Sequence, residues 1–95
     1  YFITDKIGHA QDFAKARIYL PKLAEFVREV LRKINPEKTT VILTSDHGNI
    51  EDLSVRTHTL NDVPTIVWGR RNREIAARIK DLTDITPAII KLLTE

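Results

Sequence analysis

The segment Thr39–Thr44 constrains the fold more than any other part of the chain. It reads Thr-Thr-Val-Ile-Leu-Thr, which is β-branched and apolar with no polar alternation. Such a run is typical of a strand buried on both faces, as in a parallel sheet covered by helices. Because helical and strand-like segments alternate along the chain, the sequence predicts an α/β fold, part of an α/β/α sandwich with a mostly parallel sheet.

The segment before this strand predicts a long amphipathic helix from about Ala10 to Ile34, since its apolar residues recur every three or four positions. Pro21 lies inside it and predicts a kink or a break into two helices. The other predicted elements are strands at residues 1–4 and 63–68, helices at 74–82 and from Thr83 or Asp84 onward, and polar loops at 5–9 and 45–62.

Length and composition narrow the possible functions. A chain of 95 residues holds one small domain at most. The net charge of +2 gives no reason to expect a nucleic-acid or membrane partner, and no apolar run approaches the roughly 18 residues of a membrane span. Cysteine is absent, which excludes disulfides and metal–thiolate sites and fits a cytoplasmic protein. Because the chain opens inside a predicted strand without Met, we expect residues 1–95 to be a portion of a longer chain.

The candidate chemistry lies in three loop histidines and their acidic neighbours. Asp5-Lys6-Ile7-Gly8-His9 places a carboxylate four residues before an imidazole, and Gly8 allows a tight turn. Asp46 and His47 are adjacent, and His58 follows eleven residues after His47. Each signal alone is weak, because a single loop histidine is usually a surface residue and Asp-His-Gly-Asn is also a turn-forming sequence.

Together these side chains favour a metal site. Carboxylate and imidazole ligands suit Zn, Mn or Fe. Five such groups exceed the needs of one tetrahedral ion and predict two divalent ions, which can clamp the attacking and leaving oxygens of a phosphoryl transfer. In open α/β sheets, ligands bind beyond the carboxyl ends of strands, where Asp5 and Asp46 are predicted to lie. The predicted metal ligands are Asp5, His9, Asp46, His47 and His58.

The order of these motifs resembles the alkaline phosphatase superfamily. Thr44-Ser45-Asp46-His47-Gly48-Asn49, followed by His58-Thr59-Leu60-Asn61-Asp62-Val63-Pro64, is similar to the C-terminal metal-binding signature of cofactor-independent phosphoglycerate mutases, and phosphopentomutases share that core. Asp5-Lys6-Ile7-Gly8-His9 resembles their Asp-x-x-Gly-His motif, and Asp84-Ile85-Thr86-Pro87 resembles the opening of their last helix. The resemblance covers nearly the whole chain.

The resemblance implies which of these ligands would bind each ion. By position, Asp5, His9 and His58 would hold one ion, Mn or Zn, and Asp46 and His47 would hold the other. In the family, a further Asp and a Ser or Thr nucleophile complete the second ion's site, and neither has a counterpart here. The implied parent enzyme is a phosphomutase or phosphatase that forms a covalent phosphoenzyme on a phosphorylated small molecule, and this segment alone is expected to be inactive.

Two other functions stay open at this point. The parent could be a sulfatase-like hydrolase, which shares the superfamily core. The chain could also be a metal-stabilised structural or interaction domain without turnover. The side chain of Arg56 could meet a phosphate, but loop arginines are usually solvated, and we interpret it so.

Overall fold

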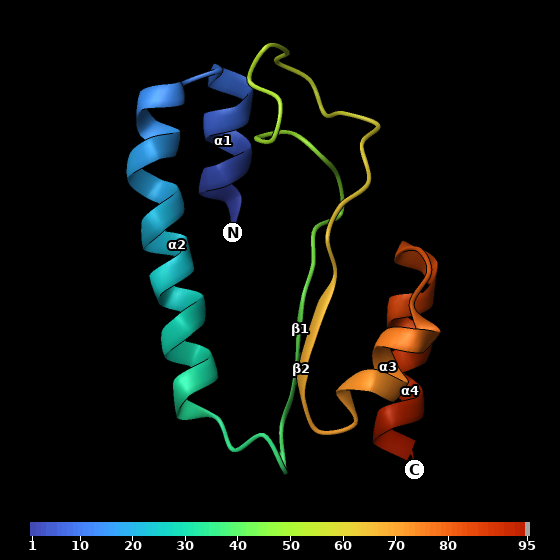
Figure 1. The fold of residues 1–95 in the computed structure, drawn as a ribbon. Coiled ribbons are helices and arrows are strands. Elements are labelled where there is room, and N and C mark those ends of the chain that lie inside the picture. The colour runs from blue at the N-terminus through green and yellow to red at the C-terminus, as the bar shows by residue number, and fades with distance from the viewer. Residues whose placement is uncertain (95) are drawn as a thin grey trace. The chain divides into compact units, whose positions relative to one another are not determined.

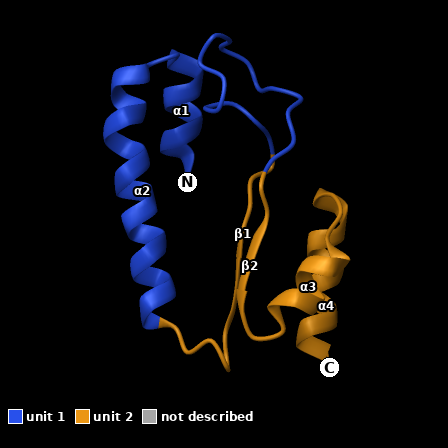
Figure 2. Cartoon of the chain, in the orientation of Figure 1, with its two compact units in different colours: residues 1–33, 47–63 blue, residues 34–46, 64–95 orange. Residues whose placement is uncertain are grey.

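The computed structural model describes residues 1–94, which form two compact units (Figures 1 and 2). The first unit contains residues 1–33 and 47–63, and the second contains residues 34–46 and the chain from residue 64 onward. Helices and strands are both present, so the chain is of the mixed α/β class that the sequence predicts.

The first unit is a helical hairpin with a long loop beside it. Helix α1 (Phe2–Ala10) packs against helix α2 (Phe13–Lys33), and Ile7 and Ala16 are the buried side chains of the pair. Gln11 ends α1 in the left-handed conformation and donates its backbone N–H to the Gly8 carbonyl. The connection is short, and α2 begins two residues after Gln11. The carboxylate of Asp12 caps the start of α2 by accepting a hydrogen bond from the Lys15 N–H.

The prediction of a strand at residues 1–4 and a loop at 5–9 is wrong. Tyr-Phe-Ile-Thr has strong strand propensity, but in the structure these residues open a helix whose buried side, at Ile7, packs on α2. Tertiary burial therefore outweighs local propensity here. As a result Asp5 and His9 stand on a helix rather than in a loop after a strand.

Helix α2 continues through Pro21, so the predicted break into two helices is also wrong. A proline inside a helix leaves the carbonyl four residues earlier without its usual donor. That residue is Arg17, which is exposed, so water can satisfy the carbonyl.

The second unit contains a two-stranded sheet. Strands β1 (Thr40–Leu43) and β2 (Ile66–Gly69) pair in antiparallel register, with Val41 opposite Trp68. Both strands lie close to their predicted places, but this pair is antiparallel and β1 is only partly buried, whereas the sequence predicted a mostly parallel sheet. The α/β/α sandwich therefore stays a prediction about a larger fold.

Three short helical elements follow the sheet. Helix α3 (Asn72–Arg78) carries Ile75, which is fully buried, and it replaces the predicted helix 74–82 with an earlier start and end. The 3-10 turn η1 (Leu82–Asp84) leads directly into α4 (Ile85–Thr94). Asp81, rather than Thr83 or Asp84, caps this region, and Asp84 completes a capping box with it. Across residues 1–94, no helix combines the length and apolarity needed to cross a membrane.

Candidate metal centre

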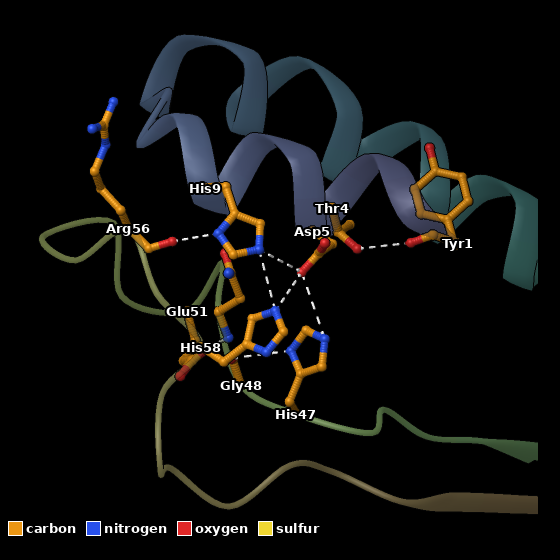
Figure 3. Close-up of polar contacts among 10 residues, drawn as sticks. Tyr1, Thr4, Asp5, His9, His47, Gly48, Glu51, Arg56 and His58 are labelled. Carbon is orange, nitrogen blue, oxygen red and sulfur yellow. Dashed lines mark hydrogen bonds and ion pairs between the residues drawn. The ribbon is translucent and has the colours of Figure 1, made fainter.

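Helix α1 provides the first two side chains of the site. Asp5 and His9 are four residues apart and therefore share one face of the helix. Their closest atoms, Asp5 Oδ1 and His9 Nε2, are 3.3 Å apart, and both side chains are a little under half exposed (Figure 3). The helix thus fixes a carboxylate and an imidazole side by side without help from any strand end.

The loop 47–63 brings the other two histidines to this face. His58 Nε2 lies 3.2 Å from both Asp5 Oδ1 and His9 Nε2. His47 Nε2 lies 3.6 Å from Asp5 Oδ1, and its ring stacks on that of His58 with centroids 3.4 Å apart. Figure 3 shows the three imidazoles turned toward the one carboxylate.

The spacing of these atoms suits a divalent ion. Ligands held at 2.0–2.1 Å around a tetrahedral ion lie roughly 3.3–3.4 Å from one another. Asp5 Oδ1, His9 Nε2 and His58 Nε2 form a triangle with sides of 3.2, 3.2 and 3.3 Å, which is close to one face of such a tetrahedron. The ligand atoms of Asp5, His47 and His58 also lie within 4.8 Å of one another. This donor set therefore suits a divalent ion, while the number and identity of the ions stay predictions.

Hydrogen bonds to the backbone orient the rings for this role. His9 Nδ1 lies 2.5 Å from the carbonyl oxygen of Arg56. A carbonyl only accepts, so Nδ1 carries the proton and, in the neutral ring, Nε2 keeps its lone pair for a metal. His47 Nδ1 lies 3.3 Å from the Gly48 carbonyl, an arrangement of the same kind. Arg56 thus contributes to the site through its backbone carbonyl, whereas from the sequence we considered its side chain as a phosphate contact.

Three imidazoles converge on one carboxylate oxygen at the centre of the cluster. Asp5 Oδ1 has only lone pairs, and three ring nitrogens approach it. If all three nitrogens were unprotonated, lone pairs would face lone pairs at about 3 Å. Either protons on the rings or a bound cation must therefore occupy this position, and the half-exposed cluster leaves access for a cation from solvent.

The packing of Gly8 holds α1 close to the loop. Gly8 and Asn49 are both buried, and a Cβ built on Gly8 would overlap the side-chain amide of Asn49. Only glycine allows the helix to approach the loop this closely. From the sequence we expected Gly8 to allow a tight turn in a loop; in the structure it lies in α1, and its missing side chain makes room for Asn49.

One carboxylate close to the site was not anticipated. Glu51 accepts hydrogen bonds from the Thr59 hydroxyl and the Asn61 amide, and these bonds lower the pKa of Glu51 to about 2. The sequence does not single out Glu51, because acidic residues are common in polar loops and its partners lie eight and ten residues away. Asp46, which precedes His47, belongs to the second compact unit, and its part in the site remains a prediction.

Comparison with known proteins identifies several phosphoglycerate mutases as relatives. The chain is similar to the 2,3-bisphosphoglycerate-independent phosphoglycerate mutases of Clostridium botulinum (28% identical over 96 residues) and Clostridium kluyveri (30% over 98 residues), each match covering 94% of this chain and 19% of the relative. The mutase of Ehrlichia canis is 27% identical over 100 residues, covering 98% of this chain and 20% of the relative. The chain thus spans about a fifth of the length of these relatives.

No solved structure matches the chain significantly. The sequence pattern of a whole family does match: that of the Metalloenzyme superfamily aligns with residues 2–94, nearly the entire chain. This agrees with the alkaline phosphatase-like resemblance of the motifs and with a cluster of side chains suited to a divalent ion. The chain belongs to the Metalloenzyme superfamily.

Proposed function

We propose that this chain is the metal-holding part of a larger enzyme that transfers or hydrolyses phosphate esters on a small molecule. The observation that carries the proposal is the triangle of Asp5 Oδ1, His9 Nε2 and His58 Nε2, with sides of 3.2–3.3 Å. The similarity to phosphoglycerate mutases supports a phosphorylated substrate, and mutase chemistry is favoured over phosphatase or sulfatase chemistry by those relatives alone.

In this proposal the chain's residues hold two ions, Mn or Zn. Asp5, His9 and His58 hold one, and Asp46 with His47 holds the other, which needs further ligands from outside this chain. In this assignment the proposed ligand of the second ion stands beside a ligand of the first, since His47 Nε2 lies 3.6 Å from Asp5 Oδ1. When bound, the ions supply Lewis-acid stabilisation of charge on the phosphoryl oxygens.

Further polypeptide of the same domain is part of the proposal. Phe2, Phe13 and Phe26 in the first unit expose 75%, 66% and 65% of their surface, and Leu93 in α4 exposes 77%. Large apolar side chains exposed to this extent suit surfaces that another part of a fold covers. We place the nucleophile and the missing ligands in that polypeptide. We also keep a cytoplasmic location without nucleic-acid partners as proposals.

A metal-stabilised domain without turnover is the second candidate. Asp5 and His9 stand on α1, while His47 and His58 stand on the loop 47–63, so an ion would cross-link two segments about 50 residues apart in sequence. Such a cross-link stabilises the folded state whether or not chemistry follows.

Metal analysis of matched variants tests the proposal. Asp5→Asn removes the central carboxylate, and Asp12→Asn makes the same charge change at a helix cap, where Asn serves as well as Asp. After dialysis against Zn²⁺ or Mn²⁺, we expect metal in the wild type and in D12N but not in D5N. Equal metal content in all three would refute the site.

A second experiment separates enzyme from structural domain. In a polypeptide that carries this chain with the rest of its domain, D5N should abolish turnover of a phosphate ester. If D5N lowers the melting temperature and metal content while the wild type turns over no phosphate ester, the structural candidate is correct.

A further inference from the structure

The loop between His47 and His58 is closed at its base by Gly48 and Thr59, which we call the neck of the loop. Gly48 and Thr59 form an antiparallel bridge in which the Thr59 N–H donates to the Gly48 carbonyl at 2.9 Å. Each bridge residue is the direct neighbour of a candidate ligand, His47 on one side and His58 on the other. The position of this bridge therefore sets how the two rings face each other.

Glu51 ties both sides of this neck together. Its Oε2 accepts the Thr59 hydroxyl at 2.5 Å and the Asn61 side-chain amide at 2.9 Å, while its Oε1 accepts the backbone N–H of Asn49. One carboxylate thus binds the residues that directly follow Gly48 and His58, as well as Asn61. Three donors to a single ionised group form a strong, directional clamp.

The contacts around Glu51 leave no room for a side chain at position 48. Gly48 is buried, and a Cβ there would overlap the Thr59 hydroxyl and come within 2.7 Å of Glu51 Oε2. Asn61 also donates its backbone N–H to Thr59 Oγ1 at 3.3 Å, so the Thr59 hydroxyl is fixed from both directions. The hydroxyl in turn fixes the backbone that carries His58.

Glu51 differs from the other acidic residue of the same turn. The Asp52 carboxylate accepts hydrogen bonds from the N–H and hydroxyl of Ser54, within its own turn. Glu51 instead reaches across the loop, and both of its oxygens accept hydrogen bonds from protein donors. This makes it a support for ligands rather than a ligand.

We propose that Glu51 is a positioning residue, whose carboxylate closes the loop neck through Thr59 and thereby sets the placement of His58 against Asp5, His9 and His47. The inference rests on the proposed metal site, which it deepens. Groups that orient metal ligands in this way typically change metal affinity 10- to 100-fold when removed.

Cobalt titration tests the inference. Co²⁺ serves as the probe because its visible absorption reports both binding and coordination geometry. Glu51→Gln keeps the shape but can accept on one side only, and Thr59→Val removes the hydroxyl. We expect each to weaken Co²⁺ binding by about 10- to 100-fold and to change the absorption band. Asp52→Asn and Thr59→Ser, which preserve the clamp, should stay within about twofold of the wild type.

The double variant E51Q/T59V shows whether the two groups act as a unit. Its loss of affinity should be close to that of the worse single variant, because both changes open the same contact. Wild-type affinity with an unchanged absorption band in E51Q would overturn the inference.

A readout that needs no metal distinguishes this inference from the metal site itself. The His58 ring stacks on that of His47 with an interplanar angle of 12°, so its ring protons should show a ring-current shift in the NMR spectrum. We expect E51Q to reduce that shift and D52N to preserve it. A wild type that binds no Co²⁺ would refute the metal site, whereas an unchanged His58 shift in E51Q would refute the role of Glu51.

Discussion

Replacement of His58 with Ala tests the site most directly. His58 Nε2 lies 3.2 Å from both Asp5 Oδ1 and His9 Nε2, so its removal leaves a candidate ion with two of its three proposed protein ligands. Sites of this kind normally keep three or more. Because loss of a supporting group alone costs 10- to 100-fold, loss of a ligand should cost at least about 100-fold in metal affinity.

The same change should hardly affect folding. The His58 side chain is 48% exposed and lies in a loop, and its main packing contact is the stack on His47. Aromatic pairs contribute about 0.5–1.5 kcal/mol beyond burial, and the exposed position favours the lower end for His58. The free energy of unfolding of the metal-free chain should therefore fall by no more than about 1 kcal/mol.

The assay is a Zn²⁺ titration of the wild type and H58A, with circular dichroism and thermal unfolding of the metal-free proteins. Thr57→Ala is the matched control, because Thr57 is the exposed neighbour of His58 in the same loop. In a longer polypeptide with both ions, H58A should lower metal content by about one ion per chain and activity by orders of magnitude. Full metal occupancy in H58A, with the fold intact, would remove His58 from the site.

Three further outcomes are expected. Gly8→Ala should lower the free energy of unfolding by on the order of 1–2 kcal/mol in denaturant melts, because overlap with Asn49 outweighs the roughly 1 kcal/mol that Ala gains in a helix, and a more stable G8A would contradict the packing described here. The pKa of Glu51 lies near 2 in the folded chain against 4.5 in the unfolded one, so its contribution to stability is complete above pH 4.5 and disappears as pH falls toward 2. Acid melts of the wild type and E51Q should therefore converge over that range, and a difference that persists at pH 2 would argue against the clamp. Finally, the 95-residue chain alone should not hydrolyse an aryl phosphate in the presence of Zn²⁺ or Mn²⁺, and metal-dependent release of the phenol by a homogeneous preparation would show that the nucleophile lies within this chain.

The local sequence pattern was sufficient to predict much of the secondary structure. The apolar periodicity of α2 and the β-branched run of β1 are properties of neighbouring residues, and both elements appear within a few positions of their predicted bounds. The first ten residues show where this approach fails. The strand propensity of residues 1–4 was outweighed by the burial of Ile7 where α1 packs on α2, a contact that propensity does not take into account.

The sequence by itself determined which side chains could hold a metal and in what order they occur. It determined this because ligand chemistry depends on residue type, and the chain has only three histidines, each with an acidic residue or other polar group nearby in sequence. Only the tertiary structure decided that His58, which is 53 residues from Asp5 in sequence, lies 3.2 Å from it in space. Helix geometry aligned Asp5 with His9, and loop closure through Glu51 and Thr59 brought His58 to them. The alignment of Asp5 with His9 is local, but the approach of His58 to both joins segments about 50 residues apart, which residue type alone does not specify.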